Sequence, residues 1–342
     1  MKTYQRLFIF TLLALAITAL LSPWAAAAWA HLIAGRADWQ HHQYSFSRIF
    51  SRFFMISGIG LFIVFRRFLK VGSLHELGLK PLTHAGRDIS LGAALSVTSM
   101  AALIGVMSFA DIFMPFFRLS LSASLSRCAG ALLAAIAAST IEEIFFRGIF
   151  FKGLRDDLGR LRGYLSASLL FSAIHFVRPA YDTILIDADP WAGVRHLASS
   201  FHPFLDPGTF LPGLFGLFLI GVTLCYAFER TGTLYLSIGL HAGWIFGLKT
   251  IRVFGDYART DLSWAFGSSN PKIVSGLATW IGIVLVGLMV HQLTLNRTRL
   301  LPDRLALILP GKSESLHVSR ENDLHERSSL FSRCKVWLSS CW

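Results

Sequence analysis

Long apolar runs separated by short polar segments make up most of this chain. A helix needs about 20 residues, each rising 1.5 Å, to cross a bilayer. Eight runs reach or approach that length, at 7–30, 53–65, 89–110, 124–146, 164–176, 209–228, 234–248 and 273–293. They lack the alternation of polar and apolar residues that is typical of a transmembrane barrel. The pattern therefore predicts an all-α, polytopic transmembrane helical bundle with about eight spans.

Three of the eight runs, the second, fifth and seventh, are short for a membrane span. We expect each of them to extend into flanking residues or to lie inside the bundle. The bundle should then divide into N-terminal transmembrane helices over 1–123, a helical core over 124–248 with an exterior loop at 178–207, an exterior loop and last helix over 249–293, and a polar cytoplasmic tail over 294–342.

Composition excludes a soluble enzyme with a single core. Of the 342 residues 54% are hydrophobic and only 15% are charged, whereas soluble domains carry about 25% charged residues. The formal net charge is +12, but the cations lie in the loops between apolar runs, where they set membrane orientation rather than bind nucleic acid. The four cysteines are scattered and show no metal-ligand or redox spacing.

The distribution of cations predicts that both termini lie in the cytoplasm of a multi-pass protein of the cell (inner) membrane, because most Lys and Arg then fall on the inside. One exterior loop, with Lys249, Arg252, Arg259 and Lys272, goes against the rule. The first run resembles a signal peptide, with Lys2 and Arg6 before it and an Ala-rich end. It continues to Leu32, however, which is long enough to span, so an uncleaved first helix is favoured.

Ionisable residues at the end of the fourth run are the first candidates for chemistry. Charged groups in the hydrocarbon are costly unless they are paired or hydrated, so they normally mark a site. Glu143 and Arg147 are spaced i,i+4 on one helical face and should form an ion pair. Glu142 points about 100° away from Glu143 and is left without a local partner. A purely structural clamp explains Glu143 and Arg147 but not Glu142.

Two histidines on later runs complete the candidate set. His175 follows Phe171 on one face of the fifth run, and His241 lies among small residues of the seventh. If the fourth helix continues to Leu158 and turns at Gly159–Gly163, Glu142 and His175 reach levels that differ by only about 5 Å. The three side chains would then meet inside the bundle.

A set of one glutamate and two histidines supports two kinds of hydrolysis. Glu142, His175 and His241 could hold a divalent metal such as zinc, whose bound water is acidified. Alternatively, the glutamate and one histidine could activate water directly while the other histidine stabilises the oxyanion. The residues alone do not separate these mechanisms.

Three motifs resemble those of the CPBP family, the CAAX-processing and bacteriocin-processing (Abi) intramembrane endopeptidases. They are Glu-Glu-Ile-Phe-Phe-Arg at 142–147, Phe-Ser-Ala-Ile-His at 171–175 and His-Ala-Gly-Trp at 241–244. The resemblance implies that Glu142 is the general base, His175 its partner and His241 the oxyanion stabiliser, with Glu143, Arg147 and Phe171 in support. It also implies a membrane-tethered or lipid-modified protein or peptide as substrate. We expect a glutamate-type site with no cofactor.

One departure from the family pattern leaves an alternative open. The family usually has Asn or Asp four residues after the last histidine, where this chain has Ile245. Isoleucine cannot donate a hydrogen bond to an oxyanion. A catalytically impaired relative that binds peptides, or acts as an immunity or scaffold factor, is therefore the main alternative. A proton-coupled transporter is a third, although no duplicated halves are visible.

Overall fold

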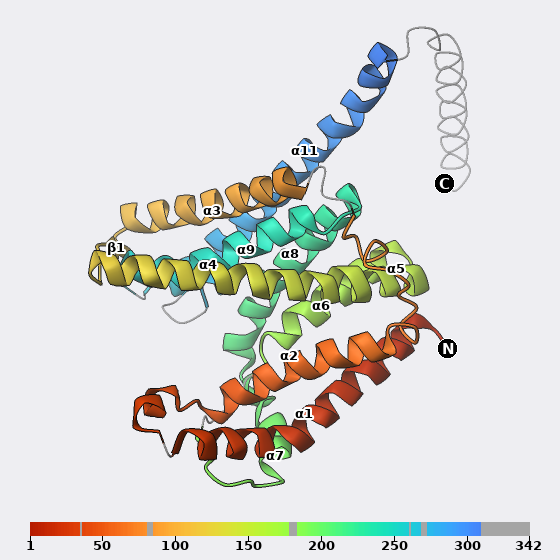
Figure 1. Ribbon diagram of the computed structural model, residues 1–342. Coiled ribbons are helices and arrows are strands. Elements are labelled where there is room, and N and C mark those ends of the chain that lie inside the picture. The colour runs from red at the N-terminus through yellow and green to blue at the C-terminus, as the bar shows by residue number, and fades with distance from the viewer. Residues whose placement is uncertain (35, 81–84, 178–182, 260, 268–271, 309–342) are drawn as a thin grey trace, which may run out of the picture. The chain divides into compact units, whose positions relative to one another are not determined.

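The computed structural model describes residues 1–34, 36–80, 85–177, 183–259, 261–267 and 272–308 (Figure 1). Each of the eight predicted apolar runs is helical. The helices are α1 (Thr3–Ala34), α2 (Phe46–Phe65), α3 (Ala85–Phe109), α4 (Leu121–Glu143), α5 (Lys152–Leu158), α6 (Arg160–Ile174), α7 (Ala192–Ser199), α8 (Pro207–Thr231), α9 (Tyr235–Thr250), α10 (Ser263–Phe266) and α11 (Leu277–Ile308). Strands β1 (Phe113–Pro115) and β2 (Gly255–Tyr257) form a short antiparallel ribbon. The all-α prediction is confirmed.

Within the described residues, six helical stretches are long and apolar enough to cross a membrane. They are Thr3–Ala34, Phe46–Phe65, Ala85–Phe109, Leu121–Leu158, Phe210–Thr231 and Leu277–Leu295. The fifth and seventh predicted runs became α6 and α9, which have only 15 and 16 residues. All residues of α9 from Tyr235 to Trp244 are buried, so this apolar run lies inside the bundle. The protein is a multi-pass membrane protein.

The chain divides into two compact units, Met1–Leu288 and Met289–Trp342. The candidate site and its packing lie wholly in the first unit. In the second unit the chain stays helical to Ile308, and the rest of the expected polar tail lies outside the described residues.

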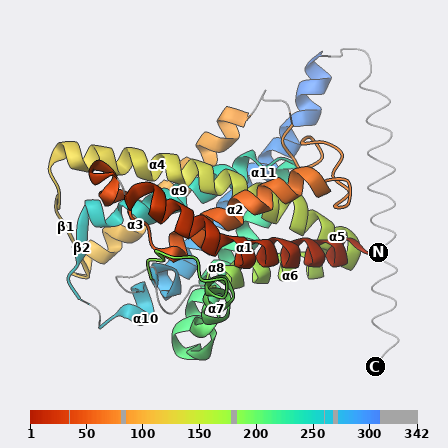
Figure 2. The same ribbon diagram turned by 60° about the horizontal axis from the view of Figure 1, so that its bottom comes forward.

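Helix α9 packs closely on α3 through glycines at every fourth position (Figures 1 and 2). A Cβ added at Gly239 would overlap the carbonyl of Ile89, and one added at Gly243 would overlap the hydroxyl of Ser96. Glycine allows such close backbone approach between membrane helices. In lipid the hydrophobic effect does not drive helices together, so the van der Waals contacts of this close approach stabilise the pair instead. This contact fixes the position of His241, which lies between the two glycines.

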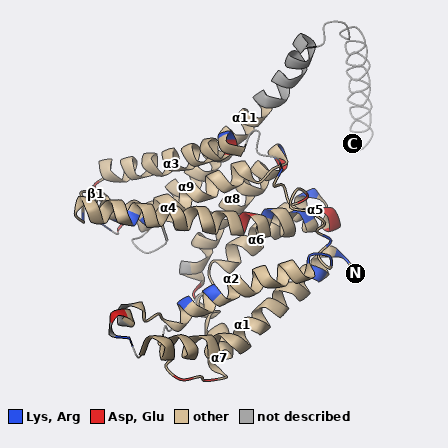
Figure 3. Ribbon diagram, in the orientation of Figure 1, with Lys and Arg blue, Asp and Glu red and all other residues tan. Residues whose placement is uncertain are grey.

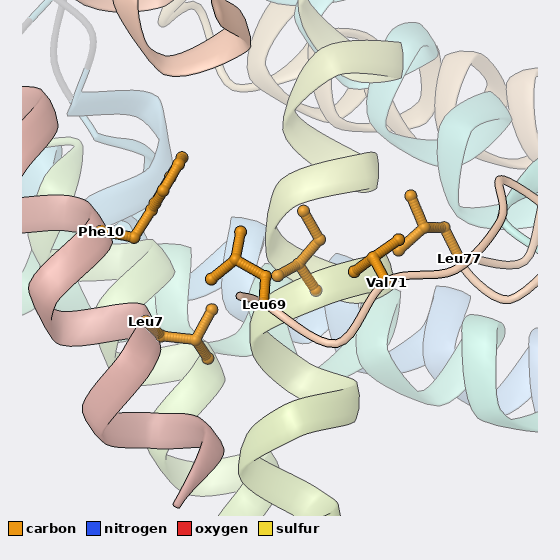
Figure 4. Packing of buried hydrophobic residues seen from close by; sticks show 6 residues of the cluster. Leu7, Phe10, Leu69, Val71 and Leu77 are labelled. Carbon is orange, nitrogen blue, oxygen red and sulfur yellow. The ribbon is translucent and has the colours of Figure 1, made fainter. Parts of the chain in front are cut away.

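The start of α1 packs into the first unit (Figure 4). Leu7 and Phe10 are buried in a cluster with Leu69, Val71, Leu77 and Ile149. The guanidinium of Arg6 donates to the carbonyl of Phe68 at 2.6 Å. These contacts hold the start of α1 against the segment 68–77 and the π-helical segment that follows α4.

The segment 178–207, expected to be an exterior loop, contains the short helix α7. Gly193 of α7 lies so close to α1 that an added Cβ would overlap the carbonyl of Ala19. The ring of His196 lies against Phe46 and Phe50, with centroids 5.0 and 4.6 Å away. The eight-residue α7 therefore ties this segment to α1 and α2 without crossing the bilayer.

The ribbon of β1 and β2 was not predicted from the sequence, and its Asp256 is a partner for Arg252, one of the cations that opposed the orientation rule. Arg118 and Arg252 both pair with Asp256, at 3.3 and 3.1 Å. The amide of Tyr257 and the guanidinium of Arg252 hold the pKa of Asp256 below its usual value. Arg259 pairs with Asp261 at 2.6 Å. Pairing offsets part of the positive charge of this loop.

The α3–α9 contact predicts a difference between two glycine substitutions. Gly239→Ala should lower the free energy of unfolding by about 1–3 kcal/mol, because the new methyl group cannot fit against the backbone of α3. Gly105→Ala on α3 is the matched control, since nothing lies within 4 Å of an added Cβ there. Thermal melting of the detergent-solubilised variants measures the difference. Equal melting temperatures would show that the α3–α9 approach is looser than described.

Candidate active site

The fourth helix continues past its two glutamates, as the sequence predicted. Ile144–Phe151 form a π-helical segment that joins α4 directly to α5. The chain then turns at Gly159, whose φ of 84° favours glycine, and α6 begins at Arg160. π-Helical segments are often found at functional sites. Here the segment begins at the residue that follows Glu143.

Glu143 and Arg147 form the predicted ion pair. The guanidinium of Arg147 donates to Glu143 Oε1 at 2.7 Å, and both side chains are fully buried. A second guanidinium nitrogen donates to the carbonyl of Gly221 on α8 at 3.5 Å. The pair thus links α4, the π-helical segment and α8.

His241 joins this pair, a contact that the sequence did not indicate. Its Nδ1 lies 2.8 Å from Glu143 Oε1, the same oxygen that accepts from Arg147. Because a carboxylate only accepts, Nδ1 carries the proton and donates it. The hydrogen bond sets the orientation of the imidazole and directs Nε2 away from Glu143.

His175 is held in a similar way by the backbone. It caps the C-terminus of α6, and its Nδ1 donates to the carbonyl of Phe171 at 2.7 Å. A carbonyl oxygen can only accept, so the neutral ring has its lone pair on Nε2. The sequence placed His175 and Phe171 on one face; the structure adds the ring orientation.

Glu142 lies where the two Nε2 atoms converge. Its Oε2 is 3.8 Å from Nε2 of His175 and 3.7 Å from Nε2 of His241. This oxygen is buried and has no hydrogen-bond partner in the described residues, although a third of the Glu142 side chain is exposed. The separations are too long for direct hydrogen bonds but suit a bridging water molecule. The structure therefore brings Glu142, His175 and His241 together, as the predicted hairpin requires.

Phe171 supports all three polar groups around it. Its buried ring lies 4.5 Å from that of His175 and 5.6 Å from that of His241, centroid to centroid. The guanidinium of Arg147 lies 4.4 Å from the ring centroid, close enough for a cation–π interaction.

The metal alternative requires Glu142, His175 and His241 to ligate one ion. No group of three His, Cys, Asp or Glu side chains within the described ranges is arranged to hold a metal ion. Ile245 is half-buried four residues after His241. The indole N–H of the neighbouring Trp244 donates to Ser99 Oγ at 3.1 Å, so this N–H is already used in a hydrogen bond to α3.

The burial of the ion pair predicts that the two adjacent glutamates differ in their effect on stability. Glu143→Gln leaves Arg147 as an uncompensated buried charge and should cost about 3–5 kcal/mol of folding free energy. Glu142→Gln should leave the melting temperature almost unchanged, because Glu142 makes no hydrogen bond to the described residues. Thermal melting of both variants checks this. A stable Glu143→Gln protein would contradict the structural role of the pair.

Comparison with known proteins gives one match. Residues 124–247 match the family model described as "Type II CAAX prenyl endopeptidase Rce1-like". No curated protein and no solved structure matches the chain. The matched range begins at the start of α4, ends in α9, and includes all the residues that meet around Glu142. Residues 124–247 therefore form a domain of the Rce1-like type II CAAX prenyl endopeptidases, the CAAX protease family that the three motifs indicated.

Proposed function

We propose that this protein is an intramembrane endopeptidase that hydrolyses a peptide bond in a membrane-tethered or lipid-modified protein or peptide. The observation that carries the proposal is the position of Glu142 Oε2, a buried oxygen without a hydrogen-bond partner in the described residues that faces Nε2 of both histidines. The family match over 124–247 supports endopeptidase activity in general. We expect the cell membrane as its location, with both termini in the cytoplasm.

Water activation is the proposed task of Glu142 and His175. A water molecule between them donates one hydrogen bond to Glu142 Oε2 and the other to the lone pair of His175 Nε2. Its oxygen attacks the peptide carbonyl while Glu142 takes the proton, and Glu142 later gives that proton to the departing amine. Such general acid–base catalysis contributes about 10²–10⁴-fold to a rate. The step needs no cofactor.

His241 is the proposed oxyanion stabiliser, and its hydrogen bond to Glu143 sets a condition on that role. Nδ1–H already donates to Glu143, so a donor at Nε2 requires the doubly protonated imidazolium. The carboxylate of Glu143 on one side and Glu142 on the other support that charge. Arg147 donates to Glu143 and holds it in place. Glu143 and Arg147 are thus positioning residues in this proposal.

Replacement of Glu142 tests the proposed base. Glu142→Gln should lower cleavage of a membrane-tethered reporter peptide by reconstituted protein to background, because an amide cannot take the proton from water. Folding should stay intact by thermal melting, and a strong chelator should leave wild-type activity unchanged. Cleavage by Glu142→Gln at the wild-type rate would reject Glu142 as the base. Loss of activity on chelation would favour the metal alternative.

Ile245 favours a second candidate function, a peptide-binding, immunity or scaffold protein with little catalysis. Loss of one oxyanion donor costs about 10²–10³ in turnover. Ile245→Asn places an amide on the face of α9 that carries His241 and should therefore raise kcat by about tenfold or more. Ile245→Leu is the control and should leave kcat unchanged. If neither wild type nor Ile245→Asn cleaves any peptide of a broad membrane-tethered library, the binding function is the better account.

A further inference from the structure

A cavity of about 290 Å³ lies where the segment before Lys80, helix α5 and the turn between α8 and α9 meet. Lys, Arg, Asp and Glu residues are concentrated at and around α5 (Figure 3). The cavity is lined by Glu76, Lys80, Lys152, Arg155 and Glu229, with Phe228 as an aromatic wall. We call it the basic cavity.

The basic cavity is separate from the candidate active site. Lys152 follows Glu142 by ten residues on one continuous helix, which corresponds to about 15 Å at 1.5 Å per residue. None of the residues that meet around Glu142 lines it. A ligand bound there would not touch the reacting groups.

The walls of the basic cavity are fixed by hydrogen bonds between distant segments. The amide of Leu234 donates to the carbonyl of Gly78 at 3.1 Å, and the hydroxyl of Tyr235 donates to the carbonyl of Lys80 at 2.5 Å. Gly78 has a φ of 94°, and a Cβ there would lie 2.7 Å from the ring of Phe228. The backbone that carries Lys80 is therefore docked against the α8–α9 turn before any ligand binds.

The two acidic residues of the cavity already have partners. The carboxylate of Glu229 accepts from Arg160 Nε at 3.0 Å and from the Tyr164 hydroxyl at 2.8 Å. The carboxylate of Glu76 accepts the amide of Gly72 at 3.1 Å. Arg160, which does not line the cavity, pairs with Glu229 at 2.8 Å, and Arg155, which does, lies 4.0 Å from the other carboxylate oxygen.

The two lysines lack such compensation. Lys152 Nζ donates to the carbonyl of Glu76 at 3.0 Å, which leaves its charge unopposed. Lys80 is exposed, and its ammonium forms no ion pair with the described residues. Arg155 adds a third cation, which pairs with Asp156 at 3.2 Å and with Glu229 at 4.0 Å. The lining thus holds three cations against two carboxylates, and the two lysines form no ion pair with the described residues.

We propose that the basic cavity binds a phosphate group, either in the headgroup of an anionic phospholipid or as free phosphate. Ammonium and guanidinium groups are the usual phosphate ligands in proteins. Basic pockets between membrane helices on the cytoplasmic side typically take anionic headgroups. The segments that line this cavity are those that the cation distribution predicts to be cytoplasmic. The site does not depend on the proposed peptidase activity.

Binding to the purified full-length chain in detergent tests the proposal. Native mass spectrometry with dioctanoyl phosphatidylglycerol should show saturable binding, whereas the zwitterionic dioctanoyl phosphatidylcholine should bind at least tenfold more weakly. Excess inorganic phosphate should displace the bound phosphatidylglycerol. If inorganic phosphate alone binds as tightly as that lipid, free phosphate is the source. Equal binding of both lipids, or no displacement by phosphate, would overturn the proposal.

A matched pair of substitutions locates the site. Lys80→Gln should weaken phosphatidylglycerol binding about tenfold through loss of a charged donor. Arg67→Gln removes an exposed cation that does not line the cavity and should leave binding unchanged. Lys80→Gln breaks no side-chain hydrogen bond to the described residues, so its melting temperature without lipid should match wild type. Wild-type affinity in the folded Lys80→Gln protein would refute the site.

Discussion

The buried carboxylate of Glu143 is the group on which the rest of the candidate site depends. One of its oxygens accepts from Arg147 at 2.7 Å and from His241 at 2.8 Å. A buried charge persists only when it is paired and hydrogen-bonded. These two donors therefore hold α4, the π-helical segment and α9 in one arrangement. Because Glu143 takes both donors, the neighbouring Glu142 is left free to face the open side.

Backbone proximity makes that arrangement possible. His241 reaches Glu143 because α9 runs through the interior, and α9 can do so because its glycines admit the backbone of α3 and the side chain of Ser96. His175 reaches the same place from α6, with its ring fixed by the Phe171 carbonyl. The side chains of Glu142 and His175 are partly exposed, whereas those of the neighbouring Glu143 and Arg147 are fully buried. A rigid interior and a reachable surface are what a hydrolytic site in a membrane needs, because water and peptide must enter without disturbing the buried ion pair.

Charged residues outside the site have different partners at the β ribbon and around α5. At and just after the β ribbon, Asp256 and Asp261 pair with Arg252 and Arg259, two of the cations that opposed the orientation rule. Around α5, the cations of the basic cavity exceed the acids that could neutralise them. Paired arginines leave little field for a ligand, whereas unpaired lysines in a preformed cavity attract an anion.

The sequence by itself determined the helical membrane fold, the Glu143–Arg147 pair and the hairpin that brings Glu142 near His175, because these follow from apolar length and helical periodicity. Only the tertiary structure decided that His241 bonds to Glu143, that α9 is buried although too short to span, and that β1 pairs with β2. Those contacts join residues nearly a hundred positions or more apart, as with Glu143 and His241 or Phe113 and Tyr257. Local patterns carry no information on such pairings, since they depend on how close two backbones approach after the helices have packed.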